Sequence, residues 1–172
     1  LHEALHRVLG LVCQELKWPI GHVFLQDAQD PDRFVDSDIW WIEPDHHFEK
    51  FIDATRRLVI KSGEGFIDEV IATGRPHWTG DIHTDETFRR SESLDDPHIK
   101  SGVVFPILVR QAVVGVVEFY SWDDTQPDTY LLEGMAEFGT QLGRVVERMN
   151  LQKQIADLTD RERRHLGQEL HD

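Results

Sequence analysis

The sequence predicts an α+β fold in which an antiparallel sheet is flanked by helices and followed by a long C-terminal helix. Two apolar, β-branched runs, 103–109 and 112–120, are separated only by Arg110 and Gln111, as in a β-hairpin. Apolar residues recur every three or four positions over residues 1–17, and again from Leu131 towards the end, which is the spacing of one helix face. Because helices and sheet must each bury an apolar face, we expect the helices to cover the sheet.

Two further strands are expected near the N-terminus. Residues 20–26 form an apolar run after the Trp18-Pro19 break, and residues 39–42 form an aromatic one. The polar stretch 27–38 lies between them. We therefore expect two antiparallel strands joined by a long connection.

The middle of the sequence alternates short helices with polar segments. Residues 48–58 repeat apolar side chains at helical spacing, and residues 66–73 predict a second short helix between two glycines. A brief strand is expected over 77–79. Residues 80–101 are polar and lack apolar periodicity, so we expect a loop with one or two helical turns, where ligands often bind.

The composition indicates one globular domain with acidic character. Of the 172 residues, 40% are hydrophobic, which is enough for a sizeable core. The formal net charge of −14 argues against nucleic acid or an anionic membrane as a partner. No apolar run reaches the roughly 20 residues that span a bilayer, and we expect no membrane contact in this part of the protein. The partners are expected to be proteins or small molecules.

A single cysteine, Cys13, restricts the redox chemistry of the chain. It can form neither an internal disulfide nor a thiolate metal cluster within one chain, which fits a reducing, cytoplasmic compartment. Cys13 adjoins the apolar stripe of the first helix, so we interpret it as a small buried hydrophobe.

Three segments occur in an order and spacing that are typical of a sensory domain. Gly65 and Gly74 suit positive-φ positions at the ends of a short helix, and Pro106 within a strand implies an edge or a bulge. The segments are Gly63-Glu64-Gly65 through Arg75-Pro76, Trp78 to Ile82 with Asp81, and Lys100-Ser101-Gly102 through Glu118-Phe119. Together they resemble a GAF domain over residues 1–145. The resemblance implies a sheet with helices on one side and a ligand pocket on the other.

The last residues resemble a phosphoacceptor box. The run Glu162-Arg163-Arg164 precedes Glu169-Leu170-His171-Asp172, as in two-component histidine kinases that pair with nitrate-response-type regulators. In that family the histidine receives a phosphoryl group from ATP, and the adjacent acid helps to deprotonate it. The resemblance implies that His171 is the acceptor and Asp172 the assisting base.

Residues 146–172 are expected to form a coiled-coil-like signalling helix leading into the kinase dimerisation region. Two apolar sets with three-four spacing differ in phase: Leu142, Val146 and Met149, then Leu151, Ile155 and Leu158. We expect this helix to pair in a parallel homodimer. The sequence holds no ATP-binding domain, so we expect no autophosphorylation by this segment alone. The resemblance implies a downstream kinase ATP-binding domain and a response regulator as partners.

The pocket implied by the resemblance has six candidate lining residues. The aromatic ones could stack on a ring, whereas the histidine spacing matches no compact metal motif, so no metal site is predicted. The candidates are Trp40, Trp78, Phe105, His77, His83 and His98. The cofactor stays unknown: none is required, and haem or a small molecule such as a cyclic nucleotide would each be compatible.

The favoured function is a sensory input domain that controls autophosphorylation of a histidine kinase through a dimeric helix. One alternative is a dimerisation spacer that binds no ligand and has a well-packed interior. Another is a haem-based gas or redox sensor, and a fourth hypothesis couples the domain to a different output, such as a phosphatase or cyclase. A bilin chromophore or methionine sulfoxide reduction is disfavoured, since both need cysteines that Cys13 cannot replace.

Overall fold

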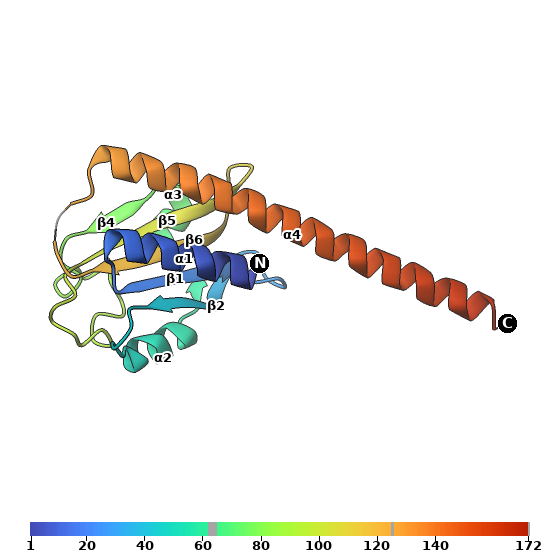
Figure 1. The fold of residues 1–172 in the computed structure, drawn as a ribbon, viewed down its shortest axis with the longest axis horizontal. Coiled ribbons are helices and arrows are strands. Elements are labelled where there is room, and N and C mark those ends of the chain that lie inside the picture. Colours follow the sequence, from blue (N-terminus) through green and yellow to red (C-terminus); the bar gives the residue numbers. More distant parts are fainter. Residues whose placement is uncertain (62–64, 125, 172) are drawn as a thin grey trace.

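A computed structural model of the chain describes residues 1–61, 65–124 and 126–171. It confirms the predicted α+β fold (Figure 1). One six-stranded sheet has the order β3-β2-β1-β6-β5-β4, and every neighbouring pair is antiparallel. The strands are β1 (Ile20–Gln26), β2 (Arg33–Ile42), β3 (Ile60–Lys61), β4 (His77–Thr79), β5 (Ser101–Val109) and β6 (Ala112–Ser121). The helices are α1 (His2–Leu16), α2 (Glu49–Arg57), α3 (Phe66–Thr73) and α4 (Thr129–Glu169).

Each face of the sheet buries its own apolar cluster. Residues of α1 and α4 pack on one face, here called the α1/α4 face. Residues of α2, α3 and the segment 80–100 pack on the other, the α2/α3 face. Strand β6 serves both, because alternate side chains point to opposite faces: Val116 and Tyr120 join the second cluster, and Val117 and Phe119 the first.

The predicted hairpin is confirmed, and its turn explains the two intervening residues. Arg110 and Gln111 have φ values of 50° and 73° between β5 and β6. A two-residue turn with both φ values positive has the twist that adjacent strands require. The predicted glycine conformations are also confirmed, with φ of 131° at Gly65 and 64° at Gly74. Gly63 and Glu64, which belong to the same motif, lie outside the described residues.

The connection predicted over residues 27–38 is wrong in its second half, because β2 already begins at Arg33. The register shifts between Val23 and Phe24 of β1, which indicates a bulge. There the hydroxyl of Ser37 donates a 2.6 Å hydrogen bond to the carbonyl of Val23. A side chain thus supports the irregular ladder, so the strand tolerates polar residues. Strand β3 was not predicted, since two residues carry no periodic pattern.

Segment 80–100 contains turns but neither an α-helix nor a strand, as expected for a loop. Pro106 also meets its expected setting. Strand β4 pairs only with residues 102–104 of β5, so Pro106 lies beyond the end of that ladder and needs no N–H. Cys13 is fully buried against Gly21, as predicted for a small hydrophobe.

Helix α4 crosses β5 and then continues away from the domain as one uninterrupted helix (Figure 1). Its first half approaches the sheet closely, because Gly139 and Gly143 lie against the backbone carbonyls of Pro106 and Leu108. From Leu151 onward its described residues are exposed. The predicted boundary between residues 145 and 146 therefore falls within a continuous helix. Among the described residues, no helix is both long and apolar enough to cross a membrane.

Two glycines of α4 provide a test of the close approach. Gly143→Ala would drive a methyl group into the carbonyl of Leu108 and is expected to lower the free energy of unfolding by about 2–3 kcal/mol. Gly134→Ala has open space around it and is expected to raise it by up to about 1 kcal/mol through helix propensity. Urea unfolding measures both variants. Equal effects of the same sign would contradict close packing of α4 on β5.

Candidate functional site

A network of polar side chains is buried in the α2/α3 face, where an apolar core would be expected. Uncompensated burial of such groups is unfavourable, so each must find a partner. The network consists of His22, Asp36, Thr55, Arg90, Glu118 and Tyr120.

The sheet provides most of this network through strand alternation. His22 lies between Ile20 and Phe24 on β1, and Glu118 lies between Val116 and Tyr120 on β6. Since alternate residues share a face, both polar side chains point into the same cluster as their apolar neighbours. Helix α2 adds Thr55, and segment 80–100 adds Arg90. The site is therefore assembled from segments far apart in the sequence.

Arg90 makes a two-pronged ion pair with Glu118. Its Nη1 donates to Glu118 Oε1 at 2.9 Å, and its Nη2 donates to Oε2 at 2.6 Å. The same guanidinium donates to Thr55 Oγ1 at 2.8 Å and to the Tyr120 hydroxyl at 3.1 Å. The exposed fraction is 5% for Arg90 and 0% for Glu118. This fork-like geometry is among the strongest ion-pair arrangements in proteins.

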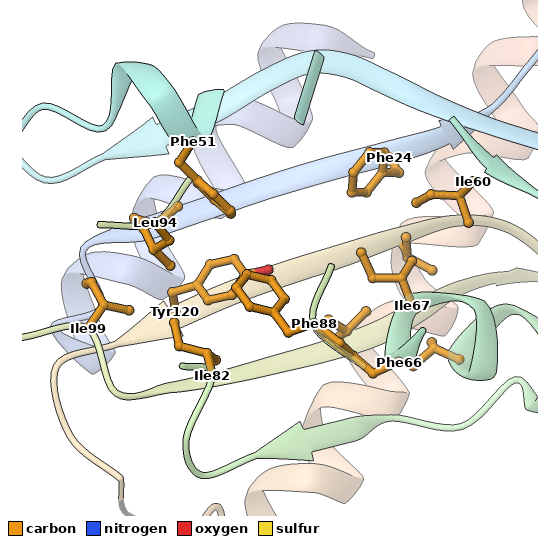
Figure 2. Close-up of a cluster of buried hydrophobic side chains, with 14 of the residues drawn as sticks. Phe24, Phe51, Ile60, Phe66, Ile67, Ile82, Phe88, Leu94, Ile99 and Tyr120 are labelled. Atoms are coloured by element: carbon orange, nitrogen blue, oxygen red, sulfur yellow. The ribbon is translucent and has the colours of Figure 1, made fainter. Parts of the chain in front are cut away.

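Aromatic rings surround the guanidinium. Its central carbon lies 4.8 Å from the ring centroid of Phe51, 5.4 Å from that of Phe88 and 5.5 Å from that of Phe24. Figure 2 shows Phe51, Phe88 and Tyr120 grouped together over the sheet, with Phe24 to one side of them. The negative face of an aromatic ring attracts a cation at such distances. Rings and carboxylate together form a cage for a planar cation.

His22 bridges the two carboxylates of the network. Its Nδ1 lies 2.8 Å from Glu118 Oε1, and its Nε2 lies 2.8 Å from Asp36 Oδ1. Both contacts are hydrogen bonds to ionised carboxylates only when both ring nitrogens carry a proton. The ring also stacks on Trp40, with 4.0 Å between centroids. His22 therefore links Glu118 on β6 to Asp36 on β2.

The surroundings shift the acid–base behaviour of the network. Burial alone would raise the pKa of Glu118, but the charge of Arg90 and the hydrogen bonds from Arg90 and His22 hold that pKa well below its ordinary value. The same opposition, with His22 as the main partner, lowers the pKa of Asp36. Burial raises the pKa of Tyr120 well above its ordinary value. Glu118 is thus an ionised acceptor, and Tyr120 a neutral donor to it at 2.6 Å.

The interior around Arg90 is filled. A crevice between α3 and residues 87–90 touches Arg90 and has a volume of only about 10 Å³, room for about one water molecule. Larger hollows lie elsewhere. One of about 270 Å³ runs between α1 and α4, and an open depression of about 480 Å³ is lined by His46, His98 and Trp122, among others.

The six predicted pocket residues are divided among three places. Trp40 and His77 belong to the α2/α3 face, where His77 lies 5.5 Å from the ring of Phe66. Trp78 and Phe105 pack on the α1/α4 face, where Phe105 stacks on Phe119 with 5.8 Å between ring centroids and lies at a tilt to Phe138 with 5.9 Å between centroids.

The remaining two candidates, His83 and His98, are exposed side chains of segment 80–100. His83 Nε2 lies 2.8 Å from the carbonyl of Ile99, and His98 Nδ1 lies 2.9 Å from Asp96. Among the described residues, no three His, Cys, Asp or Glu side chains are close enough together to hold a metal ion. That any of the six candidates contacts a ligand stays a prediction.

The predicted phosphoacceptor lies at the far end of α4. His171 is exposed in the turn that follows the helix, with its backbone N–H bonded to the carbonyl of Gln168 at 3.2 Å. An exposed imidazole at a helix end is accessible to another domain. Asp172, the predicted assisting base, lies outside the described residues.

The buried network was not predicted from the sequence. One usable signal was Glu118, a charged residue at an inward position of an otherwise apolar strand. His22 likewise occupies an inward position in the apolar strand β1. Arg90 carries no such signal, since it lies in a polar segment with several other charges.

The comparisons with known proteins agree with this architecture. The sequence profile of the GAF domain matches residues 1–147, and the chain therefore belongs to the GAF domain family. It is a GAF sensory or regulatory domain. The comparison with curated proteins finds no similar sequence.

Solved structures support the fold at low sequence identity. The GAF domain of a phosphoenolpyruvate-protein phosphotransferase from Coxiella burnetii has a TM-score of 0.71 at 14% identity, covering 88% of this chain and 85% of that one. A GAF domain from A. aeolicus, in an inactive state, has a TM-score of 0.63 at 17% identity, covering 86% and 85%. Free methionine-R-sulfoxide reductase from Neisseria meningitidis has a TM-score of 0.63 at 16% identity, covering 83% and 75%. At such identities the likeness concerns the fold alone.

The buried carboxylates predict acid sensitivity. Because folding lowers the pKa of Glu118 and Asp36, the unfolded chain binds more protons, and the free energy of unfolding decreases as the pH falls from about 6 towards 3. Glu118→Gln is expected to flatten this dependence by up to about 1.4 kcal/mol per pH unit. It should also destabilise the domain at neutral pH by about 3–5 kcal/mol, since Arg90 is left unpaired.

Urea unfolding at a series of pH values measures both effects. Glu92→Gln, which removes an exposed carboxylate of segment 80–100, is the matched control and should behave like the wild type. An unchanged pH dependence in Glu118→Gln would contradict the ionised state of Glu118.

Proposed function

We propose that this GAF domain is the sensory input of a histidine kinase and controls phosphorylation of His171 through α4. The observation that carries the proposal is the continuity of α4. One helix begins at Thr129, packs on β5 and ends two residues before His171. A shift of the sheet against α4 therefore moves the segment that bears the histidine. Rigid helices of this kind can transmit a small displacement over a long distance.

The resemblance of residues 160–172 to a phosphoacceptor box supports the chemistry. In the proposed reaction the bond between the γ-phosphorus of ATP and the oxygen that bridges it to the β-phosphate breaks, and ADP leaves. A P–N bond forms on His171. The proton on the other ring nitrogen passes to Asp172. ATP and its binding domain belong to the segment expected downstream. The GAF domain itself would regulate the reaction and perform none of its steps.

The exposed half of α4 supports a parallel homodimer. Leu151, Ile155 and Leu158 have exposed fractions of 52%, 64% and 63%. At about 100° per residue, they lie about half a turn around the helix from Leu142 and Val146, which face the sheet. A partner helix packed on this stripe would lie on the side of α4 opposite its contacts with the sheet. Burying the stripe against a second copy removes a row of large apolar side chains from water.

A second candidate function is a spacer that binds no ligand. The filled interior around Arg90 favours it, because the cavity there is too small for any ligand larger than water. Such a spacer would still dimerise, but it would show no thermal shift with small molecules. A haem sensor would instead show a Soret band that disappears when one of His77, His83 or His98 is replaced.

Phosphorylation of His171 can be tested in the full-length protein that carries this domain. With radiolabelled ATP, we expect an acid-labile phosphoryl group that is lost in His171→Gln. His165→Gln removes another exposed histidine of the same helix and should retain the label. Equal labelling of the two variants, or the absence of acid-labile label in the wild type, would contradict the proposal.

Dimerisation through the α4 stripe can be tested in the described chain. Ile155→Asp places a charge within the stripe and is expected to weaken self-association at least tenfold, measured by sedimentation equilibrium. Asn150→Asp adds the same charge about 140° around the helix from Ile155 and should leave the dimer intact. A monomeric wild type, or equal weakening by both substitutions, would refute pairing along this stripe.

A further inference from the structure

We propose that the α2/α3 face contains a binding site for small guanidinium cations, which Arg90 occupies as a tethered competitor. The site is formed by two strands and one helix. Its members are Phe24, Phe51, Thr55, Glu118 and Tyr120, and Phe88 completes it from segment 80–100. Ligand binding at this site does not depend on which output α4 controls.

The chemistry of the site is specific for a planar fork of N–H donors. Both terminal nitrogens of the bound guanidinium reach one carboxylate, at 2.9 and 2.6 Å, while its plane lies among three aromatic rings. A hydroxyl group serves each nitrogen as a further acceptor. An ammonium group has a tetrahedral set of donors and cannot reproduce both contacts with the carboxylate in one plane. The ligand class is therefore a guanidinium with a small substituent.

The acceptors are oriented by contacts that do not involve Arg90. His22 Nδ1 binds Glu118 at 2.8 Å, and the Tyr120 hydroxyl donates to Glu118 at 2.6 Å. The Thr55 hydroxyl donates to the carbonyl of Phe51 at 2.7 Å. These groups thus keep their positions when the guanidinium leaves. Glu118 would then be a buried charge without its cation, which strongly favours entry of another one.

Arg90 comes from the part of the domain that lacks regular structure. Segment 80–100 contains no helix or strand, whereas the acceptors belong to β6 and α2. The segment is held in the core by Ile82, Phe88, Leu94 and Ile99, so the exchange concerns the Arg90 side chain alone and leaves Phe88 in the site. The apparent affinity for a free guanidinium is reduced by the fraction of time that Arg90 holds the site.

Methylguanidinium at millimolar concentration, far below denaturing levels, is a suitable probe. Arg90→Ala removes the competitor, so its melting temperature is expected to rise with the logarithm of the probe concentration above Kd, by roughly 5–10 °C at a hundredfold excess over Kd. Arg89→Ala is the matched control, because it removes the adjacent exposed arginine and leaves Arg90 in place. Arg89→Ala and the wild type should both bind methylguanidinium with a Kd at least tenfold higher than that of Arg90→Ala.

Three results would overturn the proposal. They are a melting shift in Arg90→Ala no larger than in Arg89→Ala, an equal shift with urea or tetramethylammonium, and an unchanged shift after Glu118→Gln is added to Arg90→Ala. If Arg90→Ala does not fold, the wild type decides. Methylguanidinium should then shift the amide resonances of residues 81–100 and of Thr55 saturably, and unchanged resonances would exclude the site.

Discussion

The ion pair between Arg90 and Glu118 is the interaction on which the α2/α3 face depends. Burying either charge alone would be strongly unfavourable, whereas the two-pronged pair, supported by Thr55 and Tyr120, satisfies both groups. The pair joins segment 80–100 to β6. His22 then connects the same carboxylate to Asp36 on β2. The network around one carboxylate thus joins three strands, β1, β2 and β6, to α2 and to an irregular segment.

This arrangement connects the α2/α3 face with the helix on the other side of the sheet. Segment 80–100 leads directly into β5, which begins at Ser101. Helix α4 lies against the carbonyls of Pro106 and Leu108 on that strand, with glycines at the contacts. In the proposed mechanism, a rearrangement of the segment would act on α4 through β5. Close packing makes such contacts sensitive to small shifts.

The parts of the fold with strong local patterns could be predicted from the sequence. The β5–β6 hairpin, α1 and α4 each repeat apolar residues at a clear period, and Gly65 and Gly74 mark the ends of α3. The start of β2 could not be predicted, because residues 33–38 are mostly polar and their pairing depends on a bulge and on Ser37.

The buried network was missed for a related reason. A charged residue is predicted to be exposed unless its partner is known, and Arg90 and Glu118 are partners only in three dimensions. Of the six predicted pocket residues, Trp40 and His77 lie on the α2/α3 face, Trp78 and Phe105 lie on the α1/α4 face, and His83 and His98 are exposed side chains of segment 80–100. Chemical type alone therefore did not indicate which face they occupy.

A double-mutant cycle on Arg90 and Glu118 tests the central role of their pair most directly. The free energy of unfolding would be measured in urea for Arg90→Met, Glu118→Leu and the double variant. We expect each single substitution to lower the free energy of unfolding by about 3–5 kcal/mol, since it leaves one buried charge, and the double substitution to lower it by no more than either single one. Losses that simply add in the double variant would contradict that role, because the two side chains would then stabilise the domain independently.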